Sequence, residues 1–124
     1  MTTPKPDRDR RREPRALSRL AIVLTDDRQE VTATTENISA SGAYCRVSHY
    51  LPVMTKVRIR LELPGTHKPR MLKCQGVVVR IDPPLADPSH DHYDVAIFFN
   101  DLDDRDRIVL AEYVQQHLQR SPSA

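Results

Sequence analysis

The 124-residue sequence has little glycine and few aromatic side chains: it contains three glycines and no tryptophan, and aromatic residues make up 5% of the chain. A phosphate-cradling loop built on clustered glycines is therefore excluded, and no nucleophile stands in a recognisable catalytic motif. No apolar run approaches the ~20 residues that a membrane-spanning helix needs. Residues 1–6 also lack the apolar stretch of a signal peptide. We therefore expect a cytoplasmic protein that is not an enzyme, needs no cofactor and has no membrane partner.

Cysteine is also scarce, with Cys45 and Cys74 as the two copies. Without a secretory signal, two reduced and buried thiols are the expectation, because disulfides are rare in the cytosol. The predicted strands could bring the two side chains together, so a disulfide stays open as the alternative. The segment His90-Asp91-His92 has a spacing that could seed a metal site, but it lies in a loop rich in proline and aspartate. We expect a solvated loop there and no metal.

The net charge of the chain is only +2, but the charges are unevenly distributed. Residues 5–19 carry seven lysines and arginines, whereas residues 82–106 carry eight aspartates. A near-neutral total with one basic segment favours a local anion site over a surface that binds long polyanions.

Hydrophobic periodicity predicts one β-domain behind a short arm. Residues 1–14 contain three prolines and almost nothing apolar, which is typical of a flexible, arginine-rich arm. The domain is expected over residues 15–120. Apolar alternation and turn residues predict strands over residues 16–24, 30–38, 43–47, 56–63, 71–81 and 93–99. The predicted fold class is all-β with one C-terminal helix, arranged as a six-stranded antiparallel β-barrel.

The last segment changes from strand to helix periodicity. Its apolar face is predicted to contain Ile108, Val109, Tyr113, Val114, His117 and Leu118, with Leu102 as a possible addition. Asp101 or Asp103 is the expected N-cap. We also expect Tyr113 and the pair Phe98-Phe99 to belong to the core.

Two polar stretches have no apolar face and therefore do not serve the core. The first is Arg10-Arg11-Arg12-Glu13-Pro14-Arg15, and the second is Asn37-Ile38-Ser39-Ala40-Ser41-Gly42. The second stretch interrupts two predicted strands, and its Ser41-Gly42 step indicates a turn or bulge in which glycine can adopt a positive φ.

Together these stretches resemble the two-part signature of PilZ domains, the bacterial receptors for cyclic di-GMP. That signature reads R-x-x-x-R, here Arg11 and Arg15, followed by [DN]-x-S-x-x-G, here Asn37, Ser39 and Gly42. The order of the motifs, the predicted strands and the terminal helix are all similar to that family. The resemblance implies a barrel on whose exterior cyclic di-GMP binds beneath the arginine arm.

The resemblance also implies a role for each ligand-binding residue. Arg11 and Arg15, with Arg10 as an additional contact, would bind guanine edges, base faces or phosphates, since a guanidinium suits all three. Asn37 would hold a guanine from the barrel side. Ser39 would donate its hydroxyl to a phosphate, and Gly42 would let the backbone approach the ligand.

The function implied is a cyclic di-GMP receptor or adaptor that changes conformation on binding and passes the signal to a partner protein. One alternative is an adaptor of the same fold that does not bind cyclic di-GMP. The other is a small nucleic-acid-binding module, which the low aromatic content and the aspartate-rich segment make the weaker interpretation.

Overall fold

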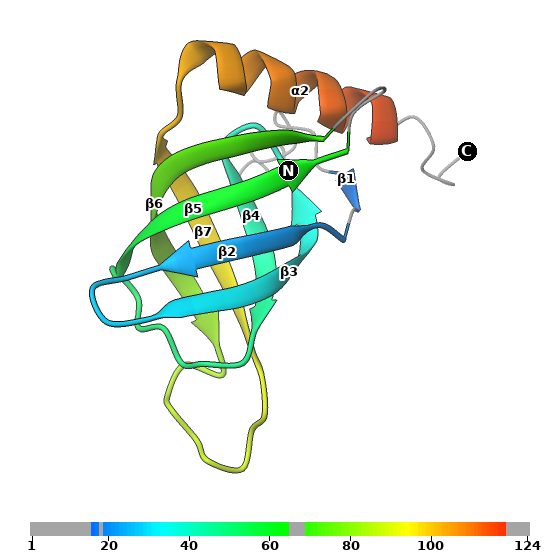
Figure 1. Cartoon of the computed structure of the whole chain (residues 1–124). Helices are drawn as coiled ribbons and strands as arrows, with labels where there is room; N and C mark the ends of the chain where they lie inside the picture. The colour runs from blue at the N-terminus through cyan, green and yellow to red at the C-terminus, as the bar shows by residue number, and fades with distance from the viewer. Residues whose placement is uncertain (1–15, 18, 65–68, 119–124) are drawn as a thin grey trace, which may run out of the picture.

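The computed structural model describes residues 16–17, 19–64 and 69–118, which form a β-barrel and one helix (Figure 1). The elements in chain order are β1 (Ala16–Leu17), β2 (Ala21–Thr25), β3 (Glu30–Ile38), β4 (Gly42–Val47), β5 (Lys56–Leu63), β6 (Arg70–Asp82), β7 (Tyr93–Asp101) and α2 (Asp104–Leu118). No helix in this described part of the chain has the length and apolar character needed to cross a membrane.

The barrel consists of six antiparallel strands and closes through β3. The strand order is β3-β2-β5-β6-β7-β4, and β4 pairs back with β3. The two-residue strand β1 pairs with the last two residues of β3, next to the end of β2. These pairings confirm the predicted six-stranded antiparallel barrel. The segment predicted as one strand over 16–24 is divided into β1 and β2.

The core is built from the inward-facing residues of alternating strands. In β5 every second residue is buried, so Val57, Ile59, Leu61 and Leu63 face inward while charged residues face solvent. One buried polar side chain, Thr35, is hydrogen-bonded to the backbone of Leu20. Its hydroxyl accepts a hydrogen bond from the Leu20 N–H at 2.8 Å, and its own N–H donates to the Leu20 carbonyl at 2.9 Å.

Gly76 lies at an irregularity in the pairing of β6 with β7. The register between β6 and β7 shifts between Gln75 and Gly76. A Cβ at Gly76 would lie 2.7 Å from the Ile59 Cδ1 and 2.8 Å from the Phe98 carbonyl oxygen. Glycine is therefore required there because neighbouring strands approach too closely for a side chain.

Helix α2 lies across the top of the barrel in the view of Figure 1 and packs against β1. The Asp103 carbonyl accepts the first helical hydrogen bond from the Arg107 N–H at 2.8 Å, which makes Asp103 the N-cap, one of the two expected positions. The buried face is centred on Leu110, with Tyr113 and Val114. The prediction that Ile108 belongs to this face is wrong: Ile108 is 59% exposed. Two residues correspond to about 200° of helical rotation, so Ile108 and Leu110 lie on opposite faces.

Both cysteines are free thiols, with Cys45 buried and Cys74 half-buried. Burial raises the pKa of Cys45 to about 12 and that of Cys74 to about 11, from an ordinary value of 9.0. Both groups therefore stay protonated at neutral pH, because a raised pKa delays thiolate formation until higher pH.

We expect iodoacetamide to alkylate Cys74 in the folded protein on the order of 100-fold more slowly at pH 8 than in the urea-unfolded chain. The thiolate is the reacting species, and a pKa two units higher leaves about one hundredth of it. Peptide mapping by mass spectrometry measures both rates. A folded-state rate equal to that of the unfolded chain would contradict this prediction.

Candidate ligand-binding site

The turn between β3 and β4 is shaped by the serine of the second motif. The Ser39 side chain is buried, and the Ser39 N–H donates to the Gly42 carbonyl at 2.9 Å. The Ser39 hydroxyl donates to the same carbonyl at 3.4 Å and accepts from the Ser41 N–H at 3.3 Å. Ser39 therefore stabilises the turn from inside, and its predicted contact with a phosphate stays a prediction.

Asn37 is turned to the outer face of the barrel by a β-bulge. The register of β3 against β4 shifts between Thr35 and Asn37, which leaves Glu36 as the extra residue. As a result Thr35 and Ile38 both face the core, whereas Glu36 and Asn37 are both half-buried on the outside. Regular alternation would have placed consecutive residues on opposite faces.

β6 contains a similar bulge on the other side of this outer surface. The register of β6 against β7 shifts between Val78 and Arg80. Val78 and Ile81 are buried, and the two residues between them, Val79 and Arg80, are both exposed. Each bulge therefore places two consecutive side chains on the outer face, at opposite margins of the same surface.

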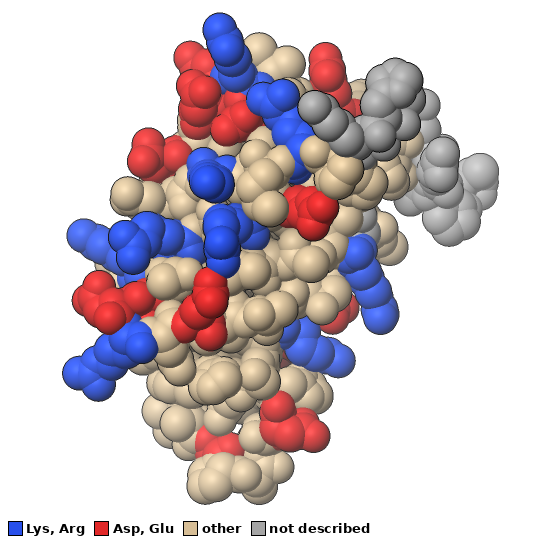
Figure 2. Space-filling model, in the orientation of Figure 1, with Lys and Arg blue, Asp and Glu red and all other residues tan. Residues whose placement is uncertain are grey.

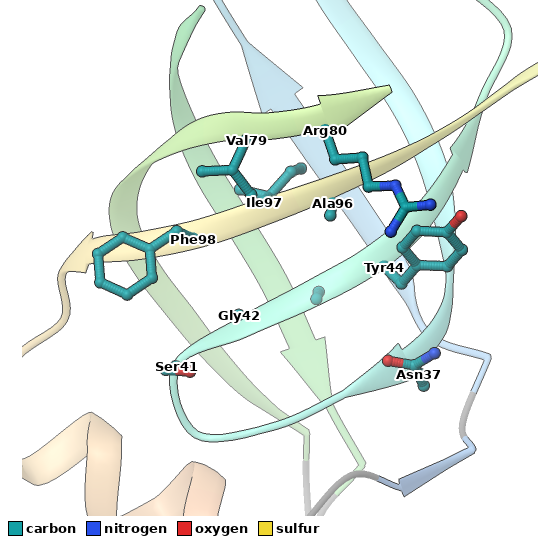
Figure 3. A pocket seen from close by; sticks show the side chains of 10 residues that line it. Asn37, Ser41, Gly42, Tyr44, Val79, Arg80, Ala96, Ile97 and Phe98 are labelled. Carbon is teal, nitrogen blue, oxygen red and sulfur yellow. The ribbon is translucent and has the colours of Figure 1, made fainter. Parts of the chain in front are cut away.

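One row of paired residues connects these margins across five strands. Asn37 pairs with both Leu17 and Tyr44, Tyr44 pairs with Ala96, and Ala96 pairs with Arg80. Directly opposite residues have Cβ atoms about 5 Å apart, so their side chains are neighbours on one face. Arg80 and Tyr44 point toward one another across the short Ala96, and Asn37 lies on the other side of Tyr44 (Figure 3).

This row borders an open groove with a volume of about 500 Å³. Arg80, Tyr44 and Asn37 gather at one end, and Phe98 lies toward the other with Gly42 and Ser41 (Figure 3). The prediction that Phe98 belongs to the core is wrong, since its side chain is 47% exposed, whereas Phe99 is buried as expected. Strand alternation can send only one of two adjacent residues inward.

Gly42 forms part of the groove floor, where β4 passes close to β7. A Cβ at Gly42 would lie 2.3 Å from the Ile97 carbonyl oxygen. None of the glycines that the structure describes has a positive φ, so the expected use of that conformation at Gly42 is not observed. Close approach of two strands explains this glycine, and the predicted approach to a ligand stays a prediction.

The arginines of the first motif, Arg10, Arg11 and Arg15, lie outside the described residues. The chain is described from Ala16, which pairs with Ile38 in β3. The residue that follows Arg15 in the sequence is therefore hydrogen-bonded into the second motif, next to Asn37. Tyr44, Val79, Arg80 and Phe98 are groove residues that the sequence alone did not indicate.

Two arginines, Arg46 and Arg107, form polar contacts with the segments around the site. Arg46 on β4 donates to Asp94 at 3.0 Å and lies 3.8 Å from Glu36. The hydrogen bond with Asp94 raises the pKa of the Arg46 guanidinium, which therefore stays charged. From α2, Arg107 donates at 3.4 Å to the carbonyls of Ala40 and Leu102, which connects the motif turn to the start of the helix.

The arrangement can bind a ligand that is both planar and anionic. Guanidinium groups donate to phosphates or to guanine edges and stack on ring faces, while aromatic side chains offer stacking surfaces. Within residues 16–17, 19–64 and 69–118, His, Cys, Asp and Glu side chains form no group of three that could hold a metal ion.

Comparison with known proteins supports the same family. A family model described as PilZ domain matches residues 9–116. The Bacillus subtilis inhibitor of motility (MotI/DgrA) is similar in structure, with a TM-score of 0.77 at 19% sequence identity and 90% of this chain covered. This chain spans about half of that protein, 53% of its length. A search of curated proteins gave no match.

The PilZ domain of YcgR from Escherichia coli, in a structure with c-di-GMP, is also similar. Its TM-score is 0.63 at 12% identity, and the match covers 90% of this chain and 93% of that domain. Identities this low show the fold alone, whereas the family model covers most of the sequence. The chain belongs to the PilZ domain family, whose members are cyclic di-GMP-linked receptor and adaptor domains rather than enzymes.

Proposed function

We propose that this protein is a receptor for cyclic di-GMP that changes conformation on binding and passes the signal to a partner protein. The ligand would bind in the groove on the outer face of β4, β6 and β7, between that face and the arginine arm. The anchoring of Ala16 beside Ile38 carries this proposal, because it brings the chain that follows Arg15 to the turn of the second motif.

The groove provides groups suited to each part of the ligand. Cyclic di-GMP presents two guanines and two phosphates. The Asn37 amide can pair with a guanine edge, and the exposed Phe98 ring offers a surface for a base. Arg80 can donate to a phosphate or stack on a base. With Arg10, Arg11 and Arg15 from the arm, the site would hold both halves of the ligand.

Ser39 and Gly42 contribute to the site through the turn between β3 and β4. Ser39 would donate to a phosphate on this proposal, and its hydroxyl would then have to leave the Gly42 carbonyl. Gly42 keeps the floor of the groove low, so that ligand atoms can approach the backbone of β4.

Calorimetric titration with cyclic di-GMP tests the proposal, with GTP and single-stranded DNA as controls. Saturable binding of cyclic di-GMP without a response to either control supports a specific receptor. Absence of cyclic di-GMP binding would overturn the receptor function and leave an adaptor of the same fold. Preferential binding of DNA would instead favour a nucleic-acid-binding module.

We expect Asn37→Asp to tighten cyclic di-GMP binding by about fivefold. A carboxylate can accept from the guanine N1–H and N2–H₂ together, whereas an amide offers one acceptor, and hydrogen bonds to charged groups are stronger by about 1 kcal/mol. The same titration measures the change. Asn100→Asp is the matched control, since Asn100 is exposed on β7 and does not line the groove. Unchanged or weaker binding by Asn37→Asp would contradict a guanine contact at this position.

A further inference from the structure

A second charged surface lies on the face of the barrel formed by β2, β5 and the first half of β6. The outward residues of β5 are three cations, Lys56, Arg58 and Arg60, followed by Glu62. Arg60 pairs directly with Lys73 on β6. We call these four cations the basic strip. Successive outward residues of a strand are about 7 Å apart, so the strip presents regularly spaced cations. Figure 2 shows that Lys and Arg side chains, in blue, gather on this face of the molecule.

Three of the four cations form no ion pair with the described residues. Among the described residues, Arg60 forms an ion pair with Glu30, whereas Lys56, Arg58 and Lys73 form none. The pairing of Arg60 with Lys73 places like charges directly opposite one another, which destabilises an isolated sheet. The pair of like charges therefore adds repulsion between β5 and β6, which an anionic partner would relieve.

The strip also has a shape suited to a partner. Arg58, Arg60 and Lys73 line an open hollow with a volume of about 510 Å³, and the carboxylates of Glu30 and Asp101 lie at its edge. The cations can bind carboxylates from several directions, and the two arginines can donate bidentate hydrogen bonds.

Acidic residues form the margin of the strip and limit what can bind. The margin consists of Asp26, Asp27, Glu30, Glu62 and Asp101. Figure 2 shows red side chains around the blue cluster. A long nucleic acid or an anionic membrane would meet these carboxylates and be repelled. A protein segment with a few carboxylates at its centre would satisfy the cations without extending over the margin.

We propose that the basic strip is the docking surface for a carboxylate-bearing segment of the partner protein. The proposal rests on the proposed function for the existence of a signalling partner. Its surface is distinct from the groove, which is lined by β4, β7 and the second half of β6. Ligand and partner can therefore be bound at the same time.

The test uses a fluorescein-labelled five-residue peptide, Glu-Thr-Glu-Thr-Glu, whose three extended carboxylates repeat at about 7 Å and match the spacing of Lys56, Arg58 and Arg60 without extending over the margin. Fluorescence anisotropy at low ionic strength compares wild type with Arg58→Glu/Lys73→Glu. We expect saturable binding to wild type and at least tenfold weaker binding to this double variant. Folding should be preserved, because Lys73→Glu places an opposite charge beside Arg60.

Arg19→Glu/Arg105→Glu is the matched control, since it makes the same charge change at exposed positions outside the strip. It should bind the peptide within about twofold of wild type. Equal weakening in both variants would overturn the proposal, because net charge alone would then explain binding. Tighter binding of a ten-nucleotide DNA or of phosphatidylserine vesicles than of the peptide would also overturn it.

Calorimetry with cyclic di-GMP separates this proposal from the receptor function. Arg58→Glu/Lys73→Glu should bind cyclic di-GMP as wild type does, since neither residue lines the groove. If wild type binds the peptide at the strip but not cyclic di-GMP, the receptor function fails and the docking surface stands. If wild type binds cyclic di-GMP but not the peptide, the docking surface fails and the receptor function stands.

Discussion

Gly42→Ala is expected to lower the free energy of unfolding by about 3 kcal/mol, near the upper end of the cost of overpacking. The added methyl group would lie 2.3 Å from the Ile97 carbonyl oxygen, which belongs to a backbone held in the sheet on both sides. The oxygen cannot rotate away as a flexible side chain could, so β4 and β7 must separate. Urea denaturation followed by circular dichroism measures the loss as a lower midpoint.

Ala40→Ser is the matched control, because Ala40 lies in the same turn and is half-buried. A substitution there should change the free energy of unfolding by less than about 0.5 kcal/mol. If Gly42→Ala unfolds at the same urea concentration as wild type, the close approach of β4 to β7 does not explain the glycine. Gly42 would then matter only for the groove. In that case a ligand titration of the folded Gly42→Ala variant would show weaker binding.

Arg11→Ala/Arg15→Ala is expected to weaken cyclic di-GMP binding by on the order of 1,000-fold. Each arginine would supply charge-assisted hydrogen bonds worth about 1.5–3 kcal/mol, and about 1.4 kcal/mol corresponds to a tenfold change in affinity. The free energy of unfolding should change little, because the described core residues begin at Ala16, after both arginines. Calorimetry measures the affinity, and urea denaturation checks the fold.

Arg28→Ala/Arg105→Ala controls for the loss of two positive charges, since both arginines are exposed and neither lines the groove. This control should bind cyclic di-GMP within about twofold of wild type. A Kd for Arg11→Ala/Arg15→Ala within threefold of wild type would remove the arm from the site. The ligand would then have to be held by the groove residues, with Arg80 as the remaining guanidinium.

Most strands follow directly from the sequence because alternation in a half-buried strand is a local property. The run from Lys56 to Leu63 shows it clearly, and the structure gives β5 the same bounds. The bulges at Glu36 and Val79 are different, because a bulge is defined by the partner strand. Nothing in the sequence around Val79 says where the register with β7 will shift.

The groove was only partly predictable for the same reason. Asn37 and Gly42 belong to a motif that the sequence shows. Arg80 belongs to no motif: a bulge turns it outward, and strand pairing places it in one row with Ala96, Tyr44 and Asn37. The phase of α2 was also missed, because Ile108 and Leu110 are equally apolar and only the packing of the helix decides between them. Ser39 shows a limit of another kind, since a motif names the residue but not whether its hydroxyl faces solvent.

The closure of the barrel through β3 has a consequence for how other molecules can recognise this domain. Each of the six barrel strands has a hydrogen-bonded neighbour on both sides, and β1 covers β3 beyond the end of β2. Open strand edges are the usual sites of β-augmentation and of edge-to-edge aggregation, because their N–H and C=O groups are unpaired. The barrel strands offer no unpaired edge for another strand to join. A partner that binds the barrel must therefore recognise side chains of its outer face.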